Sequence, residues 1–348
     1  FVTIIGLIKK KFSELIYDSI KKGNRIKINS SNDFGFLFFG PLCLLFANFL
    51  IQISRENKIN KILLCSREGF FMNKILLHLK KQKLNIPQFT YFLTSRKIAS
   101  LSSFRNFNDI INSFNLHRFE GNFKLLIESR FNLKLPSKLK KFKDFKINTV
   151  KNKKKLSFLI GKIKKIILQK SFETRSNYEK YILGLTKNKK VLFVDQGFYG
   201  SCQGYIEKIL NKKFYGAYVC YYKNNIRNKG LYDFNDSFFK KDQIIFESFF
   251  TAPHGSIRDI KKNQVFLMDK TQQNQKKFKE KEKIFKGVIN FINDYKKFIH
   301  LNSSTKSIFF CENSKKLSDF MFGEIKKNKK NISKNILNSF NHDNLFVK

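Results

Sequence analysis

Four short apolar runs, three of which lead through a loop into a helical pattern, constrain the fold of this 348-residue chain. The runs are KILLC (61–65), FTYFLT (89–94), KVLFV (190–194) and YGAYVCYY (215–222). Each has the length and the apolar character of a buried strand. Strands that alternate with helices favour a parallel sheet that is covered on both faces. We therefore expect an α/β fold, Rossmann-like in outline, with a mostly parallel sheet.

The pattern along the chain predicts three parts. Residues 1–33 form a helical lead-in or the remnant of an upstream domain, and residues 34–258 form the α/β core. A basic helical insertion interrupts this core at about 101–170. Residues 259–348 are Lys-rich, show helical periodicity and are expected to form a helical C-terminal appendage.

One stretch, FGFLFFGPLCLLFANFLI (34–51), meets the lower length bound for a membrane span. The alternative is a buried core helix that begins near Pro41, since proline is well tolerated in the first turn of a helix. Asn48 and Gln52 fall within or just after the stretch, and a strand follows within ten residues. These features favour the buried helix.

The formal net charge of +43 comes largely from 59 lysines, against only 10 arginines. A coding bias towards A and T explains much of this lysine, although a surface so basic would still attract phosphates, acidic glycans or an anionic membrane. The few arginines are more informative, because a guanidinium binds oxyanions through two parallel hydrogen bonds and Lys does not replace it. Arg67 and Arg96 therefore indicate a functional role.

Residues 134–170 hold 14 Lys and one Asp, and they allow two interpretations. The favoured one is a solvated, poorly ordered insertion. The other is an amphipathic basic helix that lies on an anionic membrane surface, which would place the protein at the periphery of the inner membrane. Nucleic-acid binding is disfavoured, because the aromatic residues follow a core-like periodicity and are not interleaved with the basic runs.

Cysteine and histidine spacing indicates neither a metal site nor a disulfide framework. The five cysteines are an odd number, are widely spaced and include no C-x-x-C pair. They are typical of reduced core thiols in a cytoplasmic protein. The five histidines have no metal-binding spacing, so no metal ligands are predicted.

Three polar loops lie at the carboxyl ends of predicted strands. They are SREG (66–69), SRK (95–97) and DQGFYGS (195–201). Loops at these ends converge on one crevice if their strands are neighbours, and ligands of parallel sheets bind there. Together they predict a site of phosphate size.

The loop DQGFYGS has a physical reason to hold an anion. Gly197 and Gly200 permit backbone conformations closed to other residues, and a helix that starts near Ser201 points its free N–H groups into the loop. Asp195 would face a sugar hydroxyl or a metal ion such as Mg²⁺ beside the phosphate. It can equally cap the turn with its own loop amides, and the sequence leaves both roles open.

The remaining candidates complete the predicted site. Arg67 and Arg96 would neutralise phosphate, Ser66 would donate, Gly69 would allow close approach and Glu68 would supply an acid. The segment FESFFTAPHGSI (246–257) adds His254 as an acid or base, although a structural histidine in a Pro-Gly turn is favoured. The candidate catalytic residues are Asp195, Glu68 and His254. The candidate binding residues are Ser66, Arg67, Gly69, Ser95, Arg96, Gly197, Gly200, Ser201, Gln203, Glu247 and Ser256.

Four blocks in order resemble a known bacterial module. They begin GPLCLLFANFL (40–50), YFLTSRKIAS (91–100), VLFVDQGFYGS (191–201) and FESFFTAPHGSI (246–257). The module is the C-terminal part of haloacid-dehalogenase-like predicted hydrolases from surface-polysaccharide gene clusters. The resemblance implies a role in making capsule or O-antigen-type polysaccharide, with a phosphatase-like domain or a glycosyltransferase as partner. Phosphatase chemistry is not expected from this chain, which lacks the D-x-D motif of the hydrolase half.

More distantly, the chain looks like a type I phosphoribosyltransferase. In that fold an acid at a strand end binds ribose hydroxyls, and the following Gly-Ser or Gly-Thr turn holds the 5-phosphate. The resemblance implies the first role for Asp195 and the second for Gly197, Gly200 and Ser201. Gln196 stands where such proteins have a second acid.

We therefore expect a cytoplasmic protein that binds a phosphorylated sugar or nucleotide sugar, and the sequence leaves open whether it also transfers the sugar. The rival expectation is a non-catalytic scaffold that holds polymer or partner enzymes through its basic surface.

Overall fold

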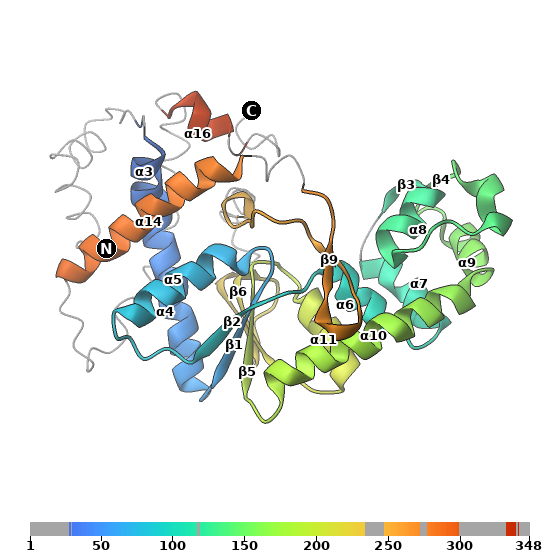
Figure 1. Cartoon of the computed structure of the whole chain (residues 1–348), viewed down its shortest axis with the longest axis horizontal. Coiled ribbons are helices and arrows are strands. Elements are labelled where there is room, and N and C mark those ends of the chain that lie inside the picture. The colour runs from blue at the N-terminus through green and yellow to red at the C-terminus, as the bar shows by residue number, and fades with distance from the viewer. Residues whose placement is uncertain are drawn as a thin grey trace.

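The computed structural model describes residues 28, 30–116, 119–233, 247–271, 277–298, 332–338 and 340. Figure 1 shows a sheet flanked by helices, with a smaller, mainly helical unit extending to its right.

Five parallel strands form the central sheet in the order β2-β1-β5-β6-β7. They are β1 (Lys61–Cys65), β2 (Gln88–Phe92), β5 (Val191–Asp195), β6 (Tyr215–Tyr221) and β7 (Asn228–Asp233). The first four coincide with the four apolar runs, which confirms the expected α/β fold. The strand β7 was not expected, because its sequence NKGLYD is mostly polar and only half-buried.

Both faces of the sheet are covered, as alternation along the strands requires. Ile62 and Leu64 of β1 point into one hydrophobic core, whereas Leu63 and Cys65 point into another. The first core is closed by α4 (Gly40–Glu56), α5 (Gly69–Lys81) and α14 (Phe278–Phe298). The second is closed by α6 (Arg96–Ser103), α10 (Lys164–Thr186) and α11 (Ser201–Leu210).

The apolar stretch at 34–51 lies in the first core, as favoured from the sequence. The helix α3 (Ser31–Phe34) continues through a π-helical segment (Gly35–Phe39) into α4. The chain from Ser31 to Glu56 is long and apolar enough to cross a membrane, but 94% of its most apolar window is buried inside the protein. A Cβ at Gly40 would lie 2.5 Å from the Phe291 side chain, so this glycine lets α14 approach closely.

The C-terminal segment is more integrated than an appendage. The helix α14 packs along α3 and α4 and contributes Ile284, Val288 and Phe291 to the first core (Figure 1). The short helix α16 (Lys334–Asn338) contributes Ile336 to the same core. The expected boundary at 258/259 falls inside β8 (Ile257–Ile260), which forms an antiparallel hairpin with β9 (Phe266–Met268) across a 3₁₀ turn (Lys262–Gln264).

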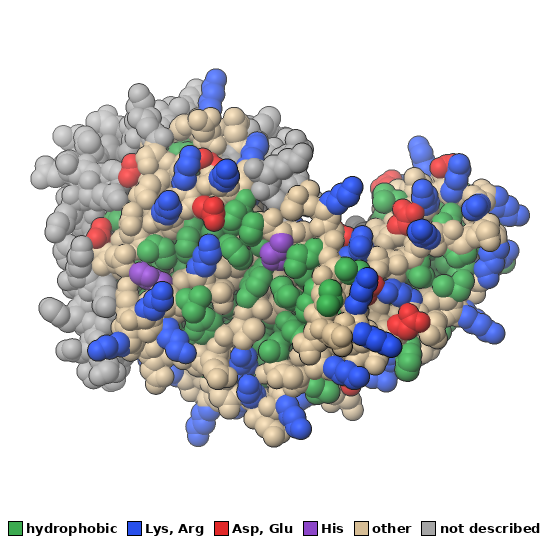
Figure 2. Space-filling model, viewed as in Figure 1, with side chains coloured by type: hydrophobic (Ala, Val, Ile, Leu, Met, Phe, Trp, Pro, Cys, Tyr) green, Lys and Arg blue, Asp and Glu red, His purple; other side chains and the backbone are tan. Residues whose placement is uncertain are grey.

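The insertion is a folded unit with its own core. It contains α7 (Phe107–Leu116), α8 (Phe123–Phe131), a 3₁₀ helix (Ser137–Phe142) and α9 (Lys153–Gly161), with the antiparallel pair β3 (Glu120–Asn122) and β4 (Lys146–Asn148). The interpretation of residues 134–170 as poorly ordered is therefore wrong. Apolar residues spaced between the lysines are buried here, among them Leu139, Ile147, Leu156, Ile160 and Ile167. Lys and Arg side chains line its outer rim in Figure 2, whereas hydrophobic side chains gather at the centre of the visible face.

Candidate functional site

The candidate site lies where the strand order reverses. The chain leaves β1 to form β2 on one side, and the next strand of the sheet, β5, lies on the other side. Leu64 of β1 is the register partner of Val194 of β5, so the loops that follow both strands start side by side. Such a switch point is the usual ligand site of an open parallel sheet.

Asp195, the last residue of β5, is held by its own loop. Its Oδ1 accepts a hydrogen bond of 2.7 Å from the Gln196 N–H. Burial raises the pKa of this carboxyl, while the Gln196 and Gly197 amides and the charge of Arg96 oppose the rise. Asp195 therefore caps its own turn. Its carboxyl is half-buried at the carboxyl edge of the sheet, within the influence of the Arg96 charge.

Glu68 supplies a second carboxyl at the same edge. Its Oε2 accepts a hydrogen bond of 2.8 Å from the Arg67 N–H, in a turn whose Ser66–Arg67 peptide is cis. Burial, followed by the negative charge of Asp195, raises the pKa of Glu68 to about 7, and Arg67 opposes the shift. Two interacting carboxyl groups, one poised near neutrality, are typical of acid–base sites.

Two arginines act on these acids, and a third arginine acts on one of these two arginines. Arg67 is half-buried, and its Nη1 is buried with no hydrogen-bond partner among the described residues. Arg96 begins α6, is exposed and acts on Asp195. Arg130 comes from α8 of the insertion, where burial, and then the positive charge of Arg96, lower its pKa. The like charges of Arg96 and Arg130 act on each other, and an anionic ligand between them would be favoured.

Arg130 is the residue that sequence reasoning missed. It carried the same signal as Arg67 and Arg96, an arginine in a chain of 59 lysines. Its position beside Arg96 depends on the packing of α8 against α6, which no local pattern reveals.

In the loop after β5, the special backbone conformation expected of two glycines is found at Gly200 but not at Gly197, whose φ is not positive. Gly200 has φ +59° and precedes the first turn of α11, which starts at Ser201. A Cβ at Gly197 would meet only Asp195 Oδ2, at 3.9 Å, so space is open above this residue. Gln196 is 8% exposed, yet neither its Nε2 nor its Oε1 has a partner in the part of the chain that the structure describes. Unpaired buried amide atoms are rare in proteins, so Gln196 has a donor and an acceptor to offer to a polar ligand.

Four predicted binding residues have structural roles instead. Ser66 Oγ donates to the Thr94 carbonyl and accepts from the Thr94 N–H. Ser95 Oγ donates to the Ile257 carbonyl and accepts from the Ile98 N–H at the start of α6. Gln203 is buried and bonded to Tyr218, Glu207 and Asn228. Gly69 is buried against β1, where a Cβ would lie 2.8 Å from the Leu64 backbone. The hydroxyls, the amide and the glycine are thus used within the fold.

The segment that begins at residue 247 lies beside the site, and its His254 bonds to residues of the fold. His254 Nε2 is 2.7 Å from the Tyr91 hydroxyl, and its Nδ1 is 2.8 Å from the Gly255 carbonyl. The favoured structural role of His254 therefore fits these contacts. Burial raises the pKa of Tyr91, the charge of Glu68 raises it further, and the charge of Arg67 opposes the rise. The charge of Glu247 contributes to the raised pKa of Glu68. Ser256 accepts a hydrogen bond from the Asp269 N–H through its backbone carbonyl.

Metal-binding residues do not gather in the described chain. No group of three or more His, Cys, Asp or Glu side chains lies close enough there to hold an ion. Cys43, Cys65, Cys202 and Cys220 are buried free thiols, and Cys311 lies outside the described residues.

Comparison with known proteins adds no family to these observations. No protein-family model matches the chain, and no curated protein is significantly similar to it.

Proposed function

We propose that the chain binds, and transfers, a phosphorylated sugar or a nucleotide sugar at the carboxyl edge of its sheet. One observation carries the proposal. The buried, unpartnered Nη1 of Arg67 belongs to the same switch-point turn as Glu68, whose pKa is raised by burial and then by the charge of Asp195.

The phosphate would interact with the arginines. A buried donor without a partner costs about 1–3 kcal/mol, and a phosphate oxygen on Arg67 Nη1 would remove that cost. The same anion would offset the repulsion between Arg96 and Arg130. The free N–H groups at the start of α11 add a favourable dipole.

The carboxyl groups would act on the sugar. Asp195 is suited to accept hydrogen bonds from sugar hydroxyls, because its charge is not consumed by an ion pair shorter than 4.0 Å among the described residues. Glu68, with a pKa of about 7, is suited to take the proton of an acceptor hydroxyl at neutral pH. In this step the acceptor oxygen bonds to the anomeric carbon, the bond from that carbon to the phosphate oxygen breaks, and the phosphate leaves with the electron pair.

The cellular role rests on the resemblance stated above. A module from surface-polysaccharide gene clusters would act in the cytoplasm beside a phosphatase-like domain or a glycosyltransferase. The basic surface of the insertion supports the second candidate, a scaffold that holds polymer or partner enzymes without chemistry. That scaffold has no use for Arg67, Glu68 or Asp195.

Calorimetry and thermal shift with sugar 1-phosphates, phosphoribosyl pyrophosphate and nucleotide sugars test the proposal. Arg67→Ala should weaken binding about tenfold or more, since a charge-assisted hydrogen bond contributes about 1.5–3 kcal/mol. Arg67→Lys should restore part of the affinity, because it keeps the charge but loses the planar fork. Asp195→Asn should retain the fold and lose turnover or hydroxyl recognition.

Arg227→Ala is the matched control. Arg227 is exposed and precedes β7, at the edge of the sheet where the strands begin. The Arg227→Ala variant should bind these ligands with the affinity of the wild type. If none of these ligands stabilises the protein, or if the Arg67 and Arg227 variants behave alike, the proposal fails.

A further inference from the structure

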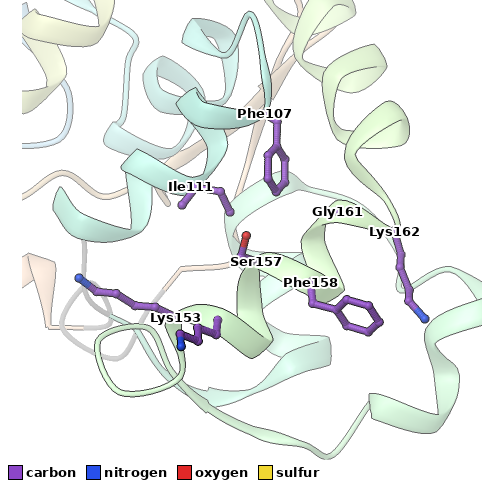
Figure 3. Close-up of a pocket in the computed structure, with 8 residues that line it drawn as sticks. Phe107, Ile111, Lys153, Ser157, Phe158, Gly161 and Lys162 are labelled. Carbon is purple, nitrogen blue, oxygen red and sulfur yellow. The ribbon is translucent and has the colours of Figure 1, made fainter.

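The insertion carries an open depression that is distant from the sheet edge. It has a volume of about 800 Å³ and lies between α7 and α9. Its floor and rim combine three apolar side chains with three lysines. These are Phe107, Ile111, Phe158, Lys153, Lys154 and Lys162, which we call the lysine-rimmed face (Figure 3).

The apolar part of this face is more exposed than a folded core requires. Phe158 is 62% exposed and points away from the helix bundle in Figure 3. Val150, in the turn before α9, is 46% exposed. The core of the insertion is already filled by Leu156, Leu159 and Ile160 of the same helix. The core does not need the Phe158 side chain, so this side chain is free to contact an apolar surface outside the protein.

The charged part of the face is of one sign. Lys153, Lys154 and Lys162 are exposed and form no salt bridge with the described acids. The only acid in residues 134–170, Asp144, lies 3.7 Å from Lys143. Lys162 Nζ lies 4.5 Å from the centroid of the Phe158 ring, a cation–π distance, so a positive charge and an exposed ring lie side by side on this face.

We propose that the lysine-rimmed face docks on an anionic phospholipid bilayer. Phe158 enters the boundary between headgroups and acyl chains, and the three lysines pair with headgroup phosphates. The face has lysines but no arginine, and Phe158 is its one well-exposed ring, whereas nucleic acid prefers successive stacking rings and arginine; the charge complementarity therefore favours a bilayer. Figure 1 shows α9 at the outer end of the insertion, away from the sheet. The inference goes beyond the proposed function and does not depend on it.

A single fluorescent reporter tests the contact directly. The chain contains no Trp, so Phe158→Trp introduces one indole at the centre of the face. Its emission should shift to shorter wavelength when phosphatidylglycerol vesicles are added, and should not shift with phosphatidylcholine vesicles. Leu77→Trp is the control, because Leu77 is 45% exposed on α5 of the core. Its emission should not respond to either vesicle.

Charge reversal tests the lysines. Lys153→Glu/Lys154→Glu/Lys162→Glu should weaken sedimentation with phosphatidylglycerol vesicles at least tenfold, since each lysine near an anionic surface contributes a severalfold gain. Lys80→Glu/Lys81→Glu/Lys83→Glu changes the net charge equally, at exposed positions in and just after α5, and should bind nearly as the wild type does. Equal losses in both triple variants, or an unshifted Phe158→Trp emission, would overturn the proposal. So would tight binding of an oligonucleotide that depends on the same lysines while vesicles are ignored.

Discussion

The Tyr218 hydroxyl occupies the space that a side chain at Gly200 would need. A Cβ at Gly200 would lie 2.6 Å from this oxygen, and Gly200 has φ +59°. The hydroxyl in turn donates to Gln203 Oε1 at 2.6 Å. The glycine, the tyrosine and the start of α11 therefore form one unit that shapes the loop after Asp195.

Gly200→Ala should lower the free energy of unfolding by about 1–3 kcal/mol, because the left-handed conformation and the contact with Tyr218 both oppose a methyl group. Urea denaturation measures the change. Gly204→Ala is the control, since Gly204 lies in α11 with nothing within 4 Å of a Cβ, and alanine there should be neutral or stabilising. Adding Tyr218→Phe to Gly200→Ala should recover only the part due to the hydroxyl contact. Equal stability of the two alanine variants would contradict this account.

The raised pKa of Glu68 predicts an unusual pH dependence of stability. The unfolded side chain titrates near pH 4.3, whereas the folded one has a pKa of about 7. Between these values the folded state binds more protons than the unfolded state, so stability falls as the pH rises through this window. From pH 5 to pH 8, the wild type should lose about 2 kcal/mol more than Glu68→Gln, as measured by urea denaturation at each pH. Parallel curves for the two proteins would show that Glu68 is not responsible.

The central sheet could be predicted because its strands are written as local patterns. Residues 62–65 and 191–194 are buried on both faces of the sheet, so they appear as short unbroken apolar runs. The strand β7 could not be predicted, since its side chains are half-buried and polar. The lysine-rich insertion misled the sequence reading, because net charge conceals the buried Leu156 and Ile160 between the lysines.

The candidate site could be predicted in part, and the limit is geometric. The turns after β1 and β5 follow from local sequence, and the structure brings Glu68 and Asp195 to one edge because their strands are neighbours. Ser66 and Ser95 stand in the same dipeptide as Arg67 and Arg96, but their hydroxyls satisfy backbone groups inside the fold. Whether the serine or the arginine of each Ser-Arg dipeptide is used inside the fold depends on long-range packing, which the dipeptide itself does not reveal.

Asp259 links the hairpin β8–β9 to the insertion, and its removal should be costly. The carboxyl is 5% exposed and accepts from Lys170 Nζ at 2.5 Å and from Asn132 Nδ2 at 2.8 Å. Asp259→Ala leaves the Lys170 charge unpaired and should lower the free energy of unfolding by about 3 kcal/mol. Asp144→Ala, which removes an exposed carboxylate, should cost less than about 0.5 kcal/mol. Adding Lys170→Met to Asp259→Ala should recover part of the loss, and a further loss would contradict the assigned pairing.

Replacing Arg130 should change the affinity for sugar phosphates while leaving the free energy of unfolding almost unchanged. Its guanidinium is half-buried beside that of Arg96, and burial and this like charge both lower its pKa, so the charged form is disfavoured in the folded protein. Arg130→Gln should therefore leave the free energy of unfolding within about 1 kcal/mol of the wild type, because the loss of packing is offset by relief of the repulsion. It should nevertheless weaken the binding of sugar phosphates about tenfold, since one charge-assisted contact is lost. Calorimetric titration and urea denaturation of the same preparation measure both quantities, and Arg227→Gln should change neither. A large loss of stability with unchanged phosphate affinity would instead assign Arg130 to the packing of α8 on α6.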